Sequence, residues 1–463
     1  MLGEKIKDAR INKGLSLNDA AKAIGVSDTC LFRIEQGDTK KPKAYILKKI
    51  ADFFDLNIID LFIEYGYIDK NDIKTNEKEQ HNNKNTECFD WKNNSSYEES
   101  IIKPEDSRIA KTYRLGELFC GPGGLAYAAI NADIGNGDRI VHTWANDFDE
   151  DTCETYIHNI CPSDPGSVYC EDVHELDYNK LSEIDALAFG FPCNDFSLVG
   201  EQLGIKGKYG PLYTYGIKAL QKFKPQWFLA ENVGGLKSAN DGLAYEKILD
   251  DMRQAGYKIY PNLYKFEEYG VPQARHRIII VGIREDIPFE FRIPSSVPYK
   301  DINVSCKYAL ENPPIADKAL NNQKIRQSET VVRRLQYIKP GQNAFNADIP
   351  DELKLNVRGA TLSQIYKRLD PEKPSYTVTG SGGGGTHMYH WDEPRALTNR
   401  ERARLQTFPD DYYFYGNNES VRRQIGMAVP QKGAIIIFEA IMKTLAGIPY
   451  ESQEENIREE IIE

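Results

Sequence analysis

The sequence predicts an α/β fold with an open parallel sheet, a smaller irregular domain, and a small all-α domain at the N-terminus. From residue 109 onward, short apolar runs alternate with amphipathic stretches; the runs are YRLGELF, IVHTWAN, IDALAFG, QWFLAEN and RIIIVGI. This alternation is typical of a parallel sheet with helices on both faces, whose ligands bind at the carboxyl ends of the strands. Residues 1–69 show helical spacing without such runs, and residues 290–395 are rich in Pro, Asn and Gly.

Composition and charge are typical of a protein that stays in the cytoplasm and has no membrane partner. The 463 residues are 41% hydrophobic and carry a net charge of −11, and no apolar run is long enough to span a membrane. The N-terminus MLGEKIKDAR is charged rather than signal-like. The eight cysteines include no C-x-x-C pair, so we expect free thiols and no metal site. Residues 1–49 carry eleven Lys and Arg against six acids, which permits a local DNA-binding face.

The N-terminal domain has the spacing of a helix-turn-helix. A first amphipathic helix stops at Gly14, Ser16 caps SLNDAAKAIG, and Ser27 caps SDTCLFRIEQG after a turn at Gly25. Two short helices joined through a glycine turn place the second helix in the major groove of DNA. Residues 1–69 resemble the Cro and phage-repressor type of DNA-binding domain; a helical hairpin for protein contacts is the alternative. The expected base-facing residues are Ser27, Asp28, Thr29 and Arg33.

The remaining chain divides by composition. Residues 70–108 are rich in Asn, Lys, Glu and Ser and are expected to form a flexible linker. Residues 109–289 form the α/β domain, residues 290–395 a separate irregular lobe, and residues 396–450 return to the α/β domain through the apolar helix GAIIIFEAIMKTL. Residues 451–463 carry six Glu against one Arg and are expected to be a solvated acidic tail.

Three strand ends near the start of the α/β domain predict an adenosine site. The first strand runs into the glycine turn ELFCGPGG, which lets a ligand approach the backbone. Asp147 ends the second strand and can accept hydrogen bonds from ribose hydroxyls, Phe148 can stack on a purine, and Asp172 can accept from an exocyclic amine. The turn lacks the complete G-x-G-x-x-G, so a nucleoside without a diphosphate fits better, and S-adenosylmethionine is such a ligand.

Three further motifs stand at strand ends, two after a strand and QARHR leading into one, and predict pyrimidine chemistry. They are GFPCNDFS at 190–197, ENVGG at 231–235 and QARHR at 273–277, and they bring together a thiol, a carboxylic acid and two guanidinium groups. The C5 carbon of cytosine is a poor nucleophile. Attack of a thiolate on C6 with protonation at N3 turns the ring into an enamine whose C5 can accept a methyl group.

With these motifs the sequence resembles the DNA (cytosine-5)-methyltransferases of bacterial restriction-modification systems. ELFCGPGG, GFPCNDFS, ENVGG, QARHR, RALTNRERARLQTFPD and QIGMAVP occur in the order and spacing of that family between about residues 114 and 447. The resemblance implies a Rossmann-like S-adenosylmethionine-dependent sheet with a target-recognition domain at 290–395. It also implies double-stranded DNA as substrate, a target cytosine flipped out of the duplex, and a cognate restriction endonuclease as functional partner.

The resemblance assigns roles to individual residues. Cys193 is the nucleophile, Glu231 gives the proton to N3, Arg277 contacts the ring carbonyl and Arg275 supports it. The residues expected to line the S-adenosylmethionine site are Phe119, Gly121, Pro122, Gly124, Asp147, Phe148, Asp172, Val173 and Leu212. Thr398 and Glu401 form a capping box, and the arginines around it, with Arg395 and Arg400, are expected to contact DNA phosphates.

The sequence departs from the family pattern at one position and leaves alternatives open. QIGMAVP has Met427 where the family usually has asparagine, so a polar contact near the cofactor is expected to be lost. The protein could act chiefly as a transcriptional regulator of its own promoter, which does not exclude methylation. It could also methylate RNA, since a relative of this family modifies transfer RNA, but the large lobe and the N-terminal domain favour DNA. Repressor-type domains often dimerise on palindromes, so monomer and dimer are both open.

Overall fold

The computed structural model describes residues 2–24, 26, 28–37, 39, 42, 44–54, 56, 61, 65, 110–191, 212–236, 242–355, 364–380 and 384–456. The chain divides into two compact units, residues 1–102 and residues 103–463, and each is described by itself. The expected linker of residues 70–108 lies outside the described residues.

The first unit is all-α, as the sequence predicts. Its described helices are α1 (Leu2–Asn12), α2 (Leu17–Ile24), α3 (Asp28–Glu35) and α4 (Ala44–Phe54). Gly14 and Gly37 have positive φ angles of 69° and 74° and follow the ends of α1 and α3. Arg10 Nε lies 2.7 Å from Oε1 of the buried Glu35, which joins α1 to α3. The core is formed by Ile6, Ala20, Ala21, Ile24, Leu31, Ile34, Leu47, Ile50, Ala51 and Phe54.

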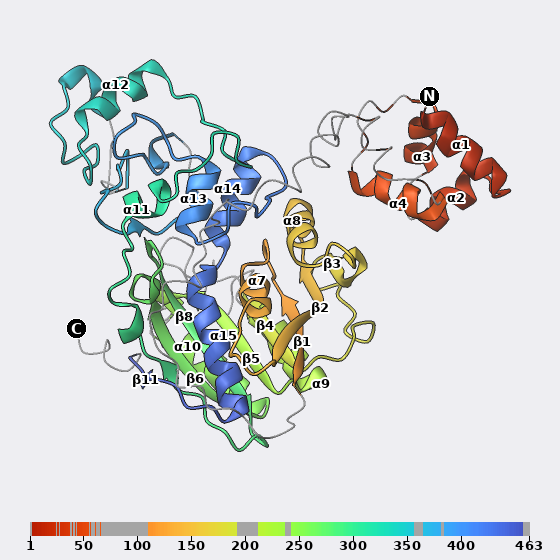
Figure 1. The fold of residues 1–463 in the computed structure, drawn as a ribbon, viewed down its shortest axis with the longest axis horizontal. Coiled ribbons are helices and arrows are strands. Elements are labelled where there is room, and N and C mark those ends of the chain that lie inside the picture. Colours follow the sequence, from red (N-terminus) through yellow and green to blue (C-terminus); the bar gives the residue numbers. More distant parts are fainter. Residues whose placement is uncertain are drawn as a thin grey trace, which may run out of the picture. The chain divides into compact units, whose positions relative to one another are not determined.

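The second unit is built on a seven-stranded sheet in the order β3-β2-β1-β4-β5-β8-β6 (Figure 1). The strands are β1 (Thr112–Leu118), β2 (Arg139–Asp147), β3 (Val168–Cys170), β4 (Ala186–Gly190), β5 (Trp227–Val233), β6 (Tyr257–Lys265) and β8 (His276–Arg284). β1 pairs in parallel with both β2 and β4. The chain order reverses between these two neighbours, and ligands of such sheets bind at this point.

The sheet is mixed rather than wholly parallel, because β8 runs antiparallel to both β5 and β6. Only the short 3-10 helix η6 (Phe266–Tyr269) and the short strand β7 (Gln273–Ala274) lie between β6 and β8. A parallel return needs a crossover of a dozen or more residues, usually with a helix. The chain therefore turns back, and QARHR leads into β8 as the sequence predicts, although that strand is antiparallel rather than parallel.

Helices cover both faces of the sheet (Figure 1). α7 (Gly124–Ile130) and α15 (Gln431–Ala446) share one core with β1, β5 and β8. α9 (Tyr213–Phe223) and α10 (Leu243–Gln254) pack in a second core on the other face. α8 (Glu150–Ile160) follows β2, and η2 (Pro165–Ser167) precedes β3. Among the described residues, one helical stretch, Asn418–Ala446, is long and apolar enough to cross a membrane. Its most apolar part is 78% buried inside the protein.

An irregular lobe with its own cores follows β8. It contains η7 (Val297–Tyr299), α11 (Cys306–Glu311), α12 (Glu329–Tyr337), η8 (Asp351–Leu353), β10 (Ser375–Tyr376), η9 (Gly384–Thr386), α13 (Asn399–Leu405) and α14 (Asn418–Met427). α13 and α14 share a core with Cys306 and Leu310 of α11. The core of the sheet includes the chain again from Val429. Tyr412, Tyr413 and Gln424 already hydrogen-bond to Pro122, Asn159 and Thr155 of the α/β domain, so the expected return from residue 396 stays a prediction.

The first part of the expected acidic tail belongs to the fold. β11 (Ser452–Gln453) pairs antiparallel with β9 (Ile293–Pro294). The Asn456 side chain donates to Leu263 O at 2.9 Å and accepts from Leu263 N at 3.1 Å. These backbone and amide hydrogen bonds outweigh the acidic composition of residues 451–456, so the prediction of a solvated tail is wrong for this part. Residues 457–463 lie outside the described residues.

Candidate active site

Glu231 and Arg277 form a largely buried ion pair where β5 and β8 adjoin. Arg277 Nε lies 3.0 Å from Glu231 Oε1, and each side chain is 12% exposed. Val233 is the register partner of Arg277, and it projects from the same face of β5 as Glu231, two residues earlier. The antiparallel turn that was missed in the sequence is thus the feature that brings the carboxyl group and the guanidinium group together.

Burial raises the pKa of Glu231 above the usual range of a glutamic acid, while the charges of Arg277 and Arg275 act in the opposite direction. Desolvation disfavours the charged form of a carboxyl group, and nearby cations favour it. Because desolvation is the larger effect, the carboxyl group of Glu231 keeps its proton to a higher pH than an exposed glutamic acid does. A group in this state can give a proton to a ring nitrogen.

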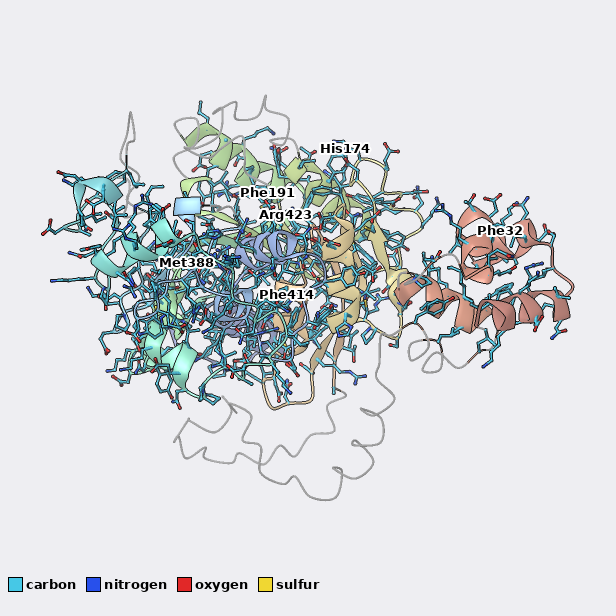
Figure 2. All side chains as sticks on the ribbon, turned by 90° about the horizontal axis from the view of Figure 1, so that it is seen from above. Phe32, His174, Phe191, Met388, Phe414 and Arg423 are labelled. Atoms are coloured by element: carbon cyan, nitrogen blue, oxygen red, sulfur yellow. The ribbon has the colours of Figure 1, made fainter. Side chains whose placement is uncertain are left out.

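The segment that contains Cys193 begins directly beside this pair. Gly190 ends β4 and is the register partner of Glu231, and a Cβ atom added to Gly190 would lie 3.2 Å from Glu231 Oε2. The next residue, Phe191, is buried (labelled in Figure 2), and its carbonyl oxygen accepts a hydrogen bond from the Asn232 side chain at 3.1 Å. Cys193 itself lies outside the described residues, which resume at Leu212.

Arg275 is buried and joins the irregular lobe to the sheet. It is 1% exposed, and its guanidinium group donates to Val378 O at 3.0 Å and to Gly426 O at 3.1 Å. Burial lowers its pKa well below the usual range of arginine. Both carbonyl partners belong to the lobe, so Arg275 holds the lobe against QARHR and leaves the contact with Glu231 to Arg277.

Glu267 is a residue of this site that sequence reasoning missed. Its Oε1 lies 2.7 Å from His276 Nε2, and its Oε2 accepts from Arg275 N at 3.3 Å. The carbonyl of His276 in turn accepts from Arg277 Nη1 at 2.7 Å. His276 contacts Glu267 whereas Arg277 contacts Glu231, so the side chain of His276 ties the turn to η6. In the sequence, only the acidic residues near QARHR could have indicated this role of Glu267.

The glycine turn after β1 binds the carboxylate of Asp147. Gly121 N donates to Asp147 Oδ2 at 2.9 Å, and Asp149 N donates to Oδ1 at 3.1 Å. Phe119, Gly121 and Gly123 have positive φ angles of 54°, 54° and 90°, a region that favours glycine. Burial raises the pKa of Asp147, and these backbone donors oppose the rise. Backbone donors of the turn and of Asp149 thus fix the carboxylate of Asp147 beside the glycines.

The other expected cofactor residues lie around this turn. Phe148 is 75% exposed, so its ring is available for stacking. Phe119, Val173 and Leu212 belong to one apolar cluster. Asp172 is exposed, and its Oδ1 accepts from His174 N at 3.0 Å and lies 2.5 Å from the His174 ring nitrogen Nδ1. A carboxylate, an exposed aromatic ring and an apolar wall suit an adenosyl group that carries no diphosphate.

Tyr412 connects this turn with the segment after motif RALTNRERARLQTFPD. Its hydroxyl donates to Pro122 O. A Cβ atom added to Gly123 would lie 2.9 Å from the same hydroxyl, and one added to Gly124 would lie 3.0 Å from Val429 O. The glycines therefore permit close packing of the chain before α15 as well as access for a ligand. Met427, at the end of α14, is 54% exposed.

A buried polar chain lies beneath the glycine turn. Glu117 is 1% exposed and accepts from the Tyr156 hydroxyl at 3.0 Å. His142 Nδ1 lies 3.2 Å from that hydroxyl and His142 Nε2 lies 2.8 Å from Ser167 Oγ. Burial raises the pKa of Glu117 to about 8 and lowers that of His142 to about 4. At neutral pH both groups are mainly uncharged, which keeps the chain free of buried charge.

The expected phosphate contact of Arg400 needs correction, whereas that of Arg395 stays a prediction. The capping box of Thr398 and Glu401 is present. Arg395 Nη2, however, lies 2.8 Å from Glu401 Oε1 and 2.9 Å from Glu393 Oε1. Arg400 is 0% exposed, and its guanidinium group donates to Leu320 O, Pro409 O and Tyr412 O at 2.8, 2.9 and 2.6 Å. Both arginines are occupied within the protein and stabilise the lobe.

The exposed residues of α3 lie where the sequence places the base-facing positions of the helix-turn-helix. Asp28, Thr29 and Arg33 are exposed, and Ser27 lies outside the described residues. Phe32 is also on this surface, with 47% exposure, and was not expected there. Among the described side chains of the same helix, Leu31, Ile34 and Glu35 are buried.

Comparisons with known proteins agree with these two units. Residues 113–443 match the family described as C-5 cytosine-specific DNA methylase, and residues 6–61 match a helix-turn-helix family. The Type II methyltransferase M.BbvI from Brevibacillus brevis is 58% identical over 352 residues, which cover 73% of this chain and 93% of that protein. M.NgoFVII from Neisseria gonorrhoeae is 40% identical over 339 residues, which cover 70% of this chain and 85% of that protein.

A solved structure supports the fold. It is described as a DNA modification methyltransferase encoded within an E. coli prophage, has 21% sequence identity and a TM-score of 0.56, and covers 72% of this chain and 99% of that chain. The family match spans most of the sheet and the lobe, and it contains Glu231, Arg277 and Asp147. The chain therefore belongs to the C-5 cytosine-specific DNA methylase family and is a DNA (cytosine-5-)-methyltransferase with an N-terminal helix-turn-helix domain.

Proposed function

We propose that the chain transfers a methyl group from S-adenosylmethionine to C5 of a cytosine flipped out of a specific short duplex sequence. In this proposal the modified DNA is protected from a cognate restriction endonuclease, and the helix-turn-helix domain binds an operator. The relatives M.BbvI and M.NgoFVII are Type II methyltransferases by name, which supports the protective role.

The proposed chemistry assigns one task to each side chain of the pair. Protonated Glu231 donates to N3 of the flipped base, and this withdraws electrons from C6. The Cys193 thiolate then adds to C6, so C5 becomes nucleophilic. Arg277, at 3.0 Å from Glu231 Oε1, donates to the ring carbonyl and keeps the carboxyl group in place. After C5 has gained its methyl group, loss of the C5 proton expels the thiolate and restores the aromatic ring.

The cofactor residues hold the second substrate beside this base. S-adenosylmethionine supplies an electrophilic methyl group on a sulfonium centre. Asp147 accepts hydrogen bonds from ribose hydroxyls, Phe148 stacks on the adenine, and Asp172 accepts from its exocyclic amine. The two strand ends that carry this work, β2 and β5, lie on opposite sides of β1 and β4 in the sheet order, so one sheet edge serves both substrates.

The observation that carries the proposal is the buried Glu231–Arg277 pair beside the start of the Cys193 segment. The experiment measures transfer of labelled methyl groups from S-adenosylmethionine to duplex DNA and to transfer RNA. Transfer to duplex DNA alone is expected. A duplex that carries 5-fluorocytosine at the target should trap wild-type protein in a covalent adduct, because the fluorine cannot leave as a proton does. Cys193→Ser should form no adduct.

The regulatory part of the proposal concerns the first unit. Exposed Asp28, Thr29 and Arg33 on α3 and the match to a helix-turn-helix family support it. Full-length protein is expected to leave a footprint on the DNA upstream of its own gene. Deletion of residues 1–69 should remove this footprint and leave methyl transfer intact. Absence of a footprint with full-length protein would contradict a role at that promoter.

A further inference from the structure

The second helix of the helix-turn-helix, α3, presents the aromatic ring of Phe32 on its exposed surface. Leu31 and Ile34 of α3 are buried at 0% exposure, whereas Phe32 is 47% exposed (Figure 2). Ile11, near the end of α1, is the other large apolar side chain exposed among the described residues of this unit, at 55%. Phe32 differs from Ile11 because it lies on the helix that enters the major groove in this class of domain.

Asp28 and Phe32 are neighbours on α3 and offer DNA two different contacts, a carboxylate acceptor and an apolar ring. Residues four apart on a helix have neighbouring side chains, and both residues are exposed. Asp28 Oδ1 accepts from Thr29 N at 2.6 Å, which fixes the carboxylate at the start of the helix, and Oδ2 can face DNA. In the major groove an apolar side chain contacts the methyl group of thymine, and a carboxylate accepts from the N4 amine of cytosine.

These two preferences meet on one base. The C4 and C5 atoms of a pyrimidine are adjacent, so an amine on C4 and a methyl group on C5 lie side by side at the major-groove edge. Thymine has the methyl group but presents an acceptor at C4, which a carboxylate does not favour. 5-Methylcytosine has both the amine and the methyl group, and it is the product of the reaction of the second unit.

We propose that Phe32 reads the C5-methyl group of a pyrimidine in the major groove, with Asp28 favouring 5-methylcytosine over thymine. The inference rests on the proposed DNA binding of the helix-turn-helix domain. Occupancy of the operator then depends on whether the cytosine in it has been methylated. The first unit thereby reports the output of the second to the promoter.

The test uses full-length protein without S-adenosylmethionine, so that no probe is methylated during the assay. Bound duplexes are selected from random pools made with cytosine or with 5-methylcytosine, and sites that Arg33→Ala no longer selects are assigned to α3. Dissociation constants are then measured on such a site with each C5-methyl group removed in turn. Thymine is replaced by deoxyuridine, and 5-methylcytosine is replaced by cytosine.

Removal of one methyl group is expected to weaken wild-type binding about three- to tenfold. Ile11→Ala should show the same loss and serves as the matched control, whereas Phe32→Ala should bind methylated and unmethylated probes equally. Dependence on 5-methylcytosine supports product sensing, whereas dependence on thymine alone would overturn the preference assigned to Asp28. The inference is overturned if Phe32→Ala keeps the methyl dependence. If Arg33→Ala loses no site at all, DNA binding by the domain fails together with the inference.

Discussion

Arg277 Nε lies 3.0 Å from Glu231 Oε1, and the two side chains are equally shielded from solvent at 12% exposure. The carboxyl group is therefore oriented by a cation, while burial raises its pKa above that of an exposed glutamic acid. These effects oppose each other in the pKa of Glu231, which is raised overall. The pair connects β5 with the antiparallel strand β8, and the predictions for catalysis depend on this contact.

Glu231→Gln should lower kcat about a hundredfold or more and leave DNA binding in place, because the amide keeps the size of the side chain but cannot transfer a proton. Wild-type kcat should fall as the pH rises through the raised pKa of Glu231, since the working form is the protonated one. A pH–rate profile between about pH 5 and 9 checks both points. An unchanged alkaline limb in Glu231→Gln would assign that limb to another group.

Glu267→Ala should lower kcat about tenfold with a smaller change in KM for DNA, because the turn that positions Arg277 loses its carboxylate anchor. Glu267 holds His276 Nε2 at 2.7 Å and Arg275 N at 3.3 Å. Its exposed neighbour Glu268 offers the matched control Glu268→Ala. Equal kinetics in the two variants would show that Glu267 does not position the site.

Glu117→Gln should stabilise the protein at pH 8 more than at pH 5. The folded-state pKa of Glu117 is about 8 against an ordinary value of 4.5, so the unfolded chain releases this proton first and stability falls as the pH rises between these values. Linkage sets an upper limit of about 4 kcal/mol for this loss at pH 8. Urea denaturation of both proteins at the two pH values measures the difference. A gain that is the same at pH 5 and pH 8 would contradict the assignment.

Arg400→Met should reduce the free energy of unfolding by about 3 kcal/mol, because three buried carbonyl oxygens lose their donor. Arg333, with 53% of its side chain exposed, gives the contrasting variant Arg333→Ala. Arg333→Ala should fold normally. If Arg333 contacts a DNA phosphate, the variant should lower the number of ions released on DNA binding by about one. A changed salt dependence in folded Arg400→Met would restore the original expectation of a phosphate contact.

The sequence predicted the elements with strong local signals. Helix caps, the apolar strands, the capping box of Thr398 and Glu401, and the burial of α15 all depend on residues close in the chain. The direction of β8 was missed because it depends on the length of the connection from β6, which apolar spacing does not report. The start of the return at residue 396 stays a prediction, because α13 and α14 pack in the core of the lobe while Tyr413 and Gln424 hydrogen-bond to α8.

The predicted site residues differ in the same way. Motifs at strand ends predicted Glu231 and Asp147, because parallel neighbours place their carboxyl ends together, whereas Arg277 lies at the entry to the antiparallel strand β8. Arg395 and Arg400 look like phosphate ligands by residue type, yet their partners come from Glu393, Leu320 and Tyr412, and such partners are set by tertiary packing. Glu267 was missed for the same reason, since it meets His276 only through the turn between β6 and β8.

The most direct test of methylation by this chain is bisulfite sequencing of plasmid DNA from a methylation-free bacterial host that expresses it. With wild-type protein we expect protected cytosines at one short repeated sequence. With Cys193→Ser at equal soluble level we expect complete conversion at the same sites. Protection that persists in Cys193→Ser would contradict the nucleophile. Complete conversion with the wild-type protein, confirmed to be folded, would contradict DNA methylation as its activity in the cell.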